Sequence, residues 1–347
     1  MKGRASTLNP PNRFETRSYE PLEVDLYDGE ERPSVPTEFL RDTSRTILSK
    51  NDSPDVHFTY SVNPYRGCEH GCIYCYARPT HEYLGFSAGL DFESKIIVKM
   101  EAPSLLAEAF QKKNWVPENV TFSGNTDCYQ PIERKLELTR KCLEVCLQYR
   151  NPAGIITKNA LVVRDIDILR EMAALDVIHV YISITTLDPE LARVMEPRTS
   201  SPENKLKAIS SLVSAGIPVG VMIAPVIPGL TDEEIPSILK AAAAHGASNA
   251  GYILVRLPGA VKQLFLEWLP RNLPDRAAKI INRIQSTREG ALSESRFGKR
   301  MVGEGAIGTT IHDLFVVNRA RYRLDTKWKP LSVKHFRNAG SDQLTLF

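Results

Sequence analysis

The stretch NPYRGCEHGCIYCYARPTHEYLG, residues 63–85, places three cysteines within eight positions. Cys68, Cys72 and Cys75 follow the spacing CxxxCxxC, which lets thiolates from one short loop bind three irons of a cuboidal iron-sulfur cluster. The fourth iron then has no nearby cysteine, because the next one along the chain is Cys128. An open iron can bind a substrate or cofactor, whereas a fourth cysteine would give a closed electron-transfer centre. The loop therefore predicts a reactive metal site.

Two other metal sites compete for the same cysteines. A structural zinc ion could take His70 or His81 as its fourth ligand, but such sites usually combine two separated ligand pairs, and the sequence has no second pair. A bacterial ferredoxin site needs CxxCxxC and a Cys-Pro partner, whereas Cys75 is followed by Tyr76. The spacing favours the open iron-sulfur site over both.

Outward from this loop, short apolar runs alternate with amphipathic stretches, a pattern typical of βα units around a parallel sheet. Strands are predicted at residues 57–63, 119–123, 154–157, 177–184, 218–224 and 251–257. Helices are predicted at residues 103–113, 133–149, 164–174, 202–215 and 232–245. This order predicts an α/β fold of the partial (β/α)6 TIM-like barrel type, with ligands at the carboxyl ends of the strands.

The chain divides into three parts by composition. Residues 1–50 are rich in Pro, Arg, Glu and Asp without periodicity, and we expect an extended, partly disordered arm. Residues 51–258 carry the repeated units and are the expected core. Residues 259–347 are expected to form a helical extension with a basic tail, since residues 296–337 hold ten Lys or Arg against three Asp or Glu.

Composition excludes some classes of protein. The 347 residues carry a net charge of only +3, so the chain as a whole gives no argument for binding a polyanion. Six cysteines are too few for a disulfide scaffold in a chain of this length. No run of 18 apolar residues occurs, and the opening residues lack the apolar centre of a signal peptide. We therefore expect a cytoplasmic protein without a membrane partner.

The cysteine loop resembles the cluster loop of radical S-adenosylmethionine (radical SAM) enzymes, in particular the spore photoproduct lyase-like branch, also described as DNA repair photolyase-like. The other motifs that carry the resemblance are TDCYQPIE (126–133), TKNALVVRDIDIL (157–169), ISITTLD (182–188), MEPR (195–198) and APVIPGLTD (224–232). The likeness extends from about Asn51 to Leu324. It implies a 4Fe-4S cluster on the three cysteines and S-adenosyl-L-methionine as the second cofactor.

The resemblance also implies which residues surround this cofactor. Gly124, Asn125, Thr126 and Asp127 come beside the methionine amino group, whose ammonium suits carbonyl, hydroxyl and carboxylate acceptors. The remaining implied contacts are Tyr74 against the nucleoside, Lys158 near the methionine carboxylate, Ser183, Arg198, Ile227 and Gly229. For each of them the alternative is an ordinary capping, rim, core or solvated position. Residues 225–232 also depart from the family pattern GxIxGxxE, with Pro for the first Gly and Asp for Glu.

Cys128 is a separate catalytic candidate. It follows Asp127 at the predicted mouth of the site, and thiols donate hydrogen atoms readily to carbon radicals. The lyase that this branch resembles uses a cysteine from the same region, although that cysteine aligns with Gly124 here. A core position is the alternative for Cys128.

The implied reaction is reductive cleavage of S-adenosylmethionine, followed by hydrogen abstraction from a substrate, with an electron donor such as flavodoxin or ferredoxin. A nucleic-acid lesion is the implied substrate, and Phe315, Tyr322 and Trp328 in the basic tail could stack bases. A solvated tail is the alternative. The rival functions are radical modification of a protein, RNA or metabolite, and a non-catalytic iron-sulfur or zinc-binding protein.

Overall fold

A computed structural model describes residues 3–15, 35–56 and 58–337 of the chain. Its centre is a sheet of six parallel strands: β3 (Tyr60–Val62), β6 (Val120–Phe122), β7 (Ala153–Thr157), β8 (Ile178–Ser183), β9 (Val219–Val226) and β10 (Asn249–Leu254). These strands are neighbours in the order of the sequence, and the antiparallel strand β2 (Leu48–Lys50) pairs with β3. The sheet is therefore the predicted partial barrel, with β10 and β2 at its open edges.

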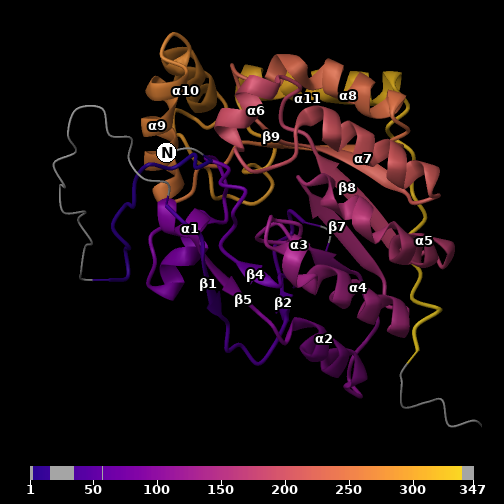
Figure 1. The fold of residues 1–347 in the computed structure, drawn as a ribbon. Coiled ribbons are helices and arrows are strands. Elements are labelled where there is room, and N and C mark those ends of the chain that lie inside the picture. Colours follow the sequence, from indigo (N-terminus) through magenta and orange to yellow (C-terminus); the bar gives the residue numbers. More distant parts are fainter. Residues whose placement is uncertain (1–2, 16–34, 57, 338–347) are drawn as a thin grey trace, which may run out of the picture.

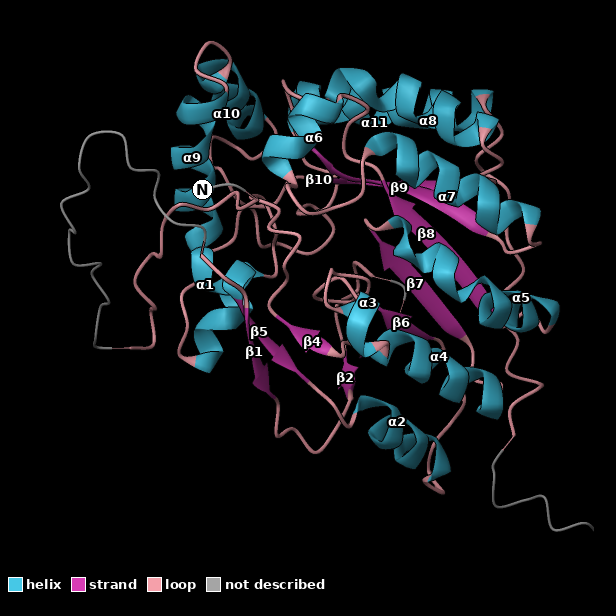
Figure 2. Cartoon of the chain, in the orientation of Figure 1, coloured by secondary structure: helices cyan, strands magenta, loops and turns pink. Residues whose placement is uncertain are grey.

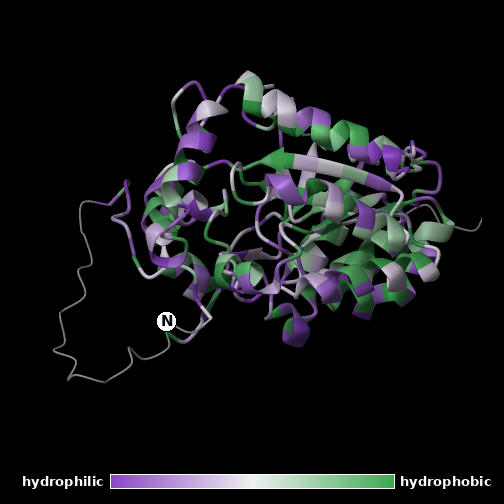
Figure 3. Ribbon diagram, turned by 90° about the horizontal axis from the view of Figure 1, so that it is seen from above, coloured by the Kyte–Doolittle hydropathy of each residue, from purple (hydrophilic) through white to green (hydrophobic). Residues whose placement is uncertain are grey.

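Amphipathic helices cover the outer face of this sheet (Figure 1 and Figure 2). They are α2 (Ala102–Gln111), α4 (Leu138–Tyr149), α5 (Ile166–Ala174), α7 (Pro202–Ser214) and α8 (Ile235–Ala244). Each helix buries residues spaced three or four apart, which places them on one face of the helix. Figure 3 shows both hydrophobic and hydrophilic residues along these helices, as that pattern requires.

The predicted α/β alternation is confirmed, with one interruption that the sequence did not indicate. The helix predicted at 133–149 is two helices, α3 (Glu133–Leu136) and α4, because Glu137 adopts a left-handed φ of 54°. Two further predicted helices begin as 3-10 turns, η2 (Ala160–Asp165) before α5 and η3 (Asp232–Glu234) before α8.

A second, three-stranded sheet frames the cysteine loop. It consists of β1 (Glu38–Arg41), β5 (Lys95–Val98) and β4 (Tyr65–Arg66), in the order β1-β5-β4. Between β4 and β5 lie the cysteines, the 3-10 helix η1 (Arg78–Leu84) and α1 (Leu90–Ser94). Because β1 and β2 come from the predicted arm, the end of that arm contributes one strand to each sheet.

The chain after the core forms α9 (Ala260–Asn272), α10 (Ala277–Ser286) and α11 (Gly305–Arg321), with α6 (Pro189–Met195) nearby in Figure 1. The tail then crosses the amino ends of the strands. Trp328 packs on His179 and Tyr181 with ring centroids 4.4 and 5.2 Å apart. Phe336 packs on Phe110.

The tail aromatics singled out in the sequence are thus occupied within the fold. Phe315 is buried against Tyr252, and Tyr322 packs against the main core. With Trp328 also packed on the sheet, each of the three rings has packing partners within the fold. None of the described helices has the length and apolar character needed to cross a membrane.

Candidate functional site

The cysteine loop lies at the carboxyl edge of the main sheet, where the loops after all six parallel strands meet. Cys68 and Cys72 are buried and Cys75 is half-buried. The loop is fixed by backbone hydrogen bonds, from Cys68 N to the Phe92 carbonyl oxygen (2.9 Å) and from Ile73 N to the Met195 carbonyl oxygen (3.0 Å). All three thiols therefore sit on one ordered loop.

Two glycines give this loop its path. Gly67 and Gly71 have φ of 78° and 66°, in the left-handed region that other residues rarely adopt. A Cβ on Gly71 would also lie 2.8 Å from the Glu93 carboxylate, and one on Gly67 would lie 3.0 Å from the Lys95 carbonyl oxygen. A side chain at either position would displace the cysteines.

The chemistry of the thiols fits a soft metal centre. Burial raises the pKa of Cys68, Cys72 and Cys75 above the ordinary range, and Asp127 raises that of Cys68 further. They are neutral thiols at pH 7 unless a metal binds and stabilises the thiolate. Among the described residues, no three His, Cys, Asp or Glu side chains are arranged to hold a single metal ion. A cuboidal cluster takes one cysteine on each of three separate irons.

Arg78 holds the loop from behind and was not singled out in the sequence. Its fully buried guanidinium donates to the carbonyl oxygens of Cys72 (3.0 Å), Gly71 (3.1 Å), Ala88 (3.2 Å) and Gly89 (2.9 Å). It also pairs with the buried Glu93 at 2.5 Å.

The segment after β6 lies beside the cysteine loop. The Gly124 carbonyl oxygen accepts a hydrogen bond from the Tyr76 hydroxyl (3.1 Å), and Asn125 N donates to Asn63 Oδ1 (3.0 Å). Thr126 Oγ1 donates to the Tyr65 carbonyl oxygen (2.6 Å). These contacts connect the loops that follow β3 and β6.

Asp127 joins three loops through its carboxylate. Oδ1 accepts from Thr157 Oγ1 (2.7 Å), and Oδ2 accepts from Lys158 N (2.8 Å) and lies 3.4 Å from His70 Nδ1. Burial alone would raise the pKa of Asp127, but His70 and backbone N–H donors hold it below its usual range. Because its oxygens already have partners, Asp127 orders the site more than it offers a free acceptor.

Lys158 enters a buried group of charges. Its ammonium donates to Thr185 Oγ1 (2.9 Å) and the Ala224 carbonyl oxygen (2.8 Å), and lies 3.4 Å from Glu196 Oε1. The other oxygen of Glu196 pairs with Lys205 Nζ at 2.8 Å. Two cations therefore share one carboxylate here.

Tyr74 completes this group. Its ring lies under Lys158, with Nζ 5.4 Å from the ring centroid, and its hydroxyl donates to Glu196 Oε1. Burial would raise the pKa of Glu196, but Lys158 and Lys205 hold it far below the ordinary range. The MEPR motif thus contributes Glu196 to the interior beside the predicted Tyr74 and Lys158.

Arg198 turns toward the cysteine loop. Its guanidinium pairs with Glu69 at 3.1 Å and donates to the Gly3 carbonyl oxygen at 3.1 Å. Glu69 in turn accepts from Ile132 N at 2.9 Å. Arg198, which the resemblance placed beside the cofactor, is thus paired with a carboxylate of the cysteine loop itself.

The remaining predicted contacts lie on later strands. Ser183 is buried at the carboxyl end of β8. Ile227 belongs to the same apolar cluster as Cys72 and Tyr74. Gly229, with φ of 80°, packs against Arg283 of α10 in the turn after β9.

Cys128 is 1% exposed and belongs to the main apolar core. Burial and the Asp127 charge raise the pKa of its thiol well above the usual range. Its backbone carbonyl accepts from Thr139 Oγ1 (2.7 Å), which ties it to α4. A hydrogen-donor role for Cys128 requires that a substrate radical reach this position.

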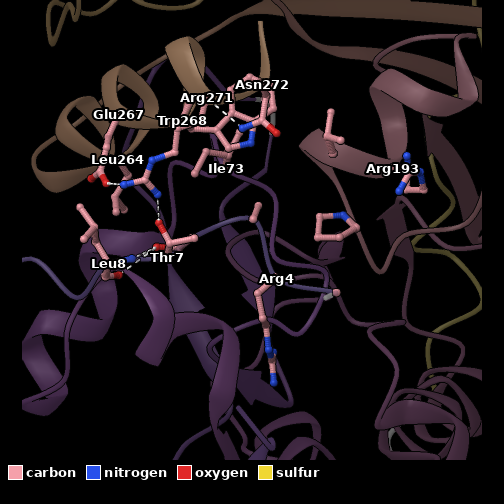
Figure 4. A pocket seen from close by; sticks show the side chains of 15 residues that line it. Arg4, Thr7, Leu8, Ile73, Arg193, Leu264, Glu267, Trp268, Arg271 and Asn272 are labelled. Carbon is pink, nitrogen blue, oxygen red and sulfur yellow. Dashed lines mark hydrogen bonds and ion pairs between the residues drawn. The ribbon is translucent and has the colours of Figure 1, made fainter. Parts of the chain in front are cut away.

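A groove of about 560 Å³ is lined by Ile73 of the cysteine loop (Figure 4). Residues 3–8, Ile73 and α9 line it, and Arg271 of α9 bonds Thr7 across one end. The amino-terminal segment is thus packed against the loop that carries the cysteines.

The model of the radical SAM superfamily matches residues 62–242 of the chain. The chain belongs to the radical SAM superfamily. Its curated relatives include uncharacterized proteins of Mycobacterium tuberculosis and Mycobacterium bovis, each 37% identical over 220 residues. That alignment covers 63% of this chain and 65% of each relative, so the chain spans about two thirds of their length.

A further curated protein and two solved structures are also similar to this chain. An uncharacterized protein of Methanocaldococcus jannaschii is 31% identical over 175 residues, 50% of this chain and 63% of the relative. A spore photoproduct lyase variant superposes with a TM-score of 0.60 at 18% identity, over 84% of this chain and 85% of that one. Another variant, with bound AdoMet and dinucleoside spore photoproduct, matches with a TM-score of 0.60 at 17% identity and the same coverage. This radical SAM chain therefore has the fold of spore photoproduct lyase.

Proposed function

We propose that this chain is a radical SAM enzyme that holds a 4Fe-4S cluster on Cys68, Cys72 and Cys75 and binds S-adenosyl-L-methionine at the open iron. The observation that carries the proposal is that one ordered loop presents two buried cysteines and one half-buried cysteine at the carboxyl edge of the sheet. When bound, cluster and cofactor supply reductive cleavage of the sulfonium and a 5′-deoxyadenosyl radical that takes hydrogen from a substrate. The residues of the chain bind and orient the cofactor and hold the substrate in place.

The residues beside the loop divide into two proposed roles. Gly124, Asn125 and Thr126 receive the methionine ammonium, while Asp127 holds their segment against β7. The other proposed contacts are Lys158 and Ser183 near the methionine carboxylate, and Tyr74, Ile227 and Gly229 on the nucleoside side. Because Arg198 pairs with Glu69, we assign it to positioning the cysteine loop.

The substrate is proposed to enter at the carboxyl edge, within a core of residues 51–258 flanked by the arm 1–50 and the extension 259–347. Tyr76 is half exposed there, and the Arg256 guanidinium lies 5.7 Å from its ring centroid. Such a wall can hold a C–H bond in place and exclude water during hydrogen transfer.

A nucleic-acid lesion is the proposed substrate class. One solved relative of this fold is complexed with dinucleoside spore photoproduct, which supports a damaged dinucleotide as the first substrate to try. A base in duplex DNA would have to be extruded to reach the edge of the sheet. Cys128 is the proposed hydrogen donor in the return step. The alternative substrates are a protein, an RNA or a metabolite.

Anaerobic reconstitution tests the cofactor proposal. We expect about four irons per chain and release of 5′-deoxyadenosine that depends on dithionite or a flavodoxin or ferredoxin donor. The triple variant Cys68→Ala, Cys72→Ala, Cys75→Ala should lose both, whereas Cys142→Ala, which changes a core cysteine, should keep both. One zinc per chain would favour a structural site, and four irons without cofactor cleavage would favour electron transfer.

A labelled substrate tests the substrate class. Dinucleoside spore photoproduct and thymine-dimer oligonucleotides, deuterated at candidate positions, should transfer deuterium to 5′-deoxyadenosine. Transfer from a component of cell extract alone, with none from the lesions, would instead support the alternative substrates. Unchanged products from Cys128→Ala would contradict the role of Cys128.

A further inference from the structure

We propose that Arg78, Glu93 and residues 4–6 form a brace that positions the cysteine loop and sets how firmly it retains a cluster. This proposal rests on the proposed function, because it presumes that the loop holds an iron-sulfur cluster. The family match begins at residue 62, so the amino-terminal member of the brace lies outside it.

The first part of the brace is Arg78, whose guanidinium has a protein acceptor for each of its N–H donors. A guanidinium has five N–H donors, and five protein acceptors surround this one: four carbonyl oxygens and the Glu93 carboxylate. Two of the carbonyls belong to Gly71 and Cys72, in the middle of the CxxxCxxC motif. Lysine, with three donors on a tetrahedral ammonium, cannot replace this planar fork.

The second part joins this pair to the start of the chain. Glu93 Oε1 accepts from Ser6 N (3.0 Å) and Oε2 accepts from Ala5 N (3.2 Å), and Arg4 donates to the Glu93 carbonyl oxygen. Arg4, Ala5 and Ser6 are all buried. A segment some 88 residues away in sequence thus supplies donors to the carboxylate that holds Arg78.

A parallel set of contacts fixes the other end of the loop. Arg198 bonds both Glu69, which lies between the first two cysteines, and the Gly3 carbonyl oxygen. Thr37, from the same arm, donates to Glu69 at 3.1 Å. The arm therefore holds the loop through two carboxylates, Glu69 and Glu93.

This arrangement predicts how the cluster responds to changes in residues that never touch it. Groups that orient metal ligands typically change metal affinity by about 10- to 100-fold when mutated. Removing the Glu93 charge would also leave the buried positive charge of Arg78 beside the cluster. That charge favours the more negative reduced state and should raise the midpoint potential.

The test measures iron release from the reconstituted full-length protein to a chelator under argon. We expect Arg78→Lys to release iron about 10-fold faster than wild type. Arg296→Lys is the matched control, because Arg296 also pairs with carboxylates but lies on the exposed surface of the extension. Circular dichroism of each apoprotein checks that the variant is folded.

Two further variants keep the test independent of misfolding at Arg78. Glu93→Gln should shift the midpoint potential upward, a directional change that a loss of packing alone does not require. Ala5→Pro removes the N–H donated to Glu93 and should speed iron release, whereas Ala5→Ser keeps that N–H and should behave as wild type.

Equal release by wild type and Arg78→Lys, or an unshifted potential in Glu93→Gln, would overturn the brace. Equal rates of iron release by Ala5→Pro and Ala5→Ser would show that the amino-terminal arm is not part of the brace. Wild type that takes up no iron would overturn the proposed function together with the brace, whereas normal uptake with unaffected variants would overturn the brace alone.

Discussion

Two groups of buried charged side chains flank the cysteine loop, and they differ in net charge. Arg78 and Glu93 form a neutral pair with no exposed side-chain surface, in which five acceptors satisfy the guanidinium. Lys158, Lys205 and Glu196 instead carry one more positive than negative charge. The balanced pair is suited to holding backbone in place. The unbalanced group is suited to receiving an anion, such as the cofactor carboxylate.

The largest expected effect breaks the balanced pair. Arg78→Met removes the cation that pairs with the buried Glu93 carboxylate, which should lower the free energy of unfolding by about 3–5 kcal/mol. Denaturant unfolding of the apoprotein measures this. Arg78→Met combined with Glu93→Gln should recover part of the loss. A loss below about 1 kcal/mol in the single variant would show that the pair is not under strong electrostatic constraint.

His81 differs from both charge groups, because its buried ring nitrogens have no hydrogen-bond partner among the described residues. His81 is fully buried between Phe86 and Phe92, and burial lowers its pKa from 6.5 to about 4. The neutral ring is therefore favoured in the fold. Its contribution to stability is complete above pH 6.5 and is lost as the pH falls toward 4, by up to roughly 3 kcal/mol.

Unfolding of the apoprotein at intervals between pH 7 and pH 4 measures this loss. His81→Phe should flatten the pH dependence over that window. His179, whose pKa burial also lowers to about 4, lies under Trp328 at the opposite edge of the sheet and provides the second comparison. If the unfolding free energy of His81→Phe depends on pH as that of the wild type does, His81 is not the source of the loss of stability.

A smaller effect separates the two lysines of the unbalanced group. Lys158→Met should weaken S-adenosylmethionine binding to the reconstituted protein about 10-fold, equivalent to about 1.4 kcal/mol. Lys205→Met should change binding much less, because Lys205 is fully enclosed and faces Glu196. Equilibrium titration gives both values. If both variants weaken S-adenosylmethionine binding equally, the two lysines and Glu196 act together, and Lys158 is not the one lysine that faces the cofactor.

The smallest effect lies on the surface. Arg296→Gln removes contacts to three glutamates, yet these ions are hydrated, and the change in unfolding free energy should stay below about 1 kcal/mol. The same denaturant measurement provides it. If Arg296→Gln lowers the unfolding free energy as much as Arg78→Met, exposed and buried ion pairs do not differ in their contribution to stability.

The sequence predicts those parts of the structure whose residues recur along the chain or lie close together in it. Six apolar runs marked the six parallel strands, and close spacing marked Cys68, Cys72 and Cys75 as one site. β4 was missed because two residues carry no periodicity, and β5 because it interrupts the βα alternation. The break at Glu137 leaves no local signal, since a charged residue there fits a continuous helix.

The buried charges could not be predicted for a different reason. Arg78 and Glu93 are 15 residues apart, and Ala5 is 88 residues from Glu93, so no spacing rule connects them. Lys205 had the pattern of an ordinary lysine in an amphipathic helix. Only Glu196 had a sequence signal, since it stands in the same motif as Arg198.

The path of the tail has a consequence for synthesis. Residues from Gly3 to Lys205 already include the cysteines and both charge groups, whereas Trp328 and Phe336 are translated later. Amino-terminal parts of a chain generally fold first. The proposed cluster site can therefore form on a nascent chain before the aromatic side chains of the tail pack against the opposite edge of the sheet.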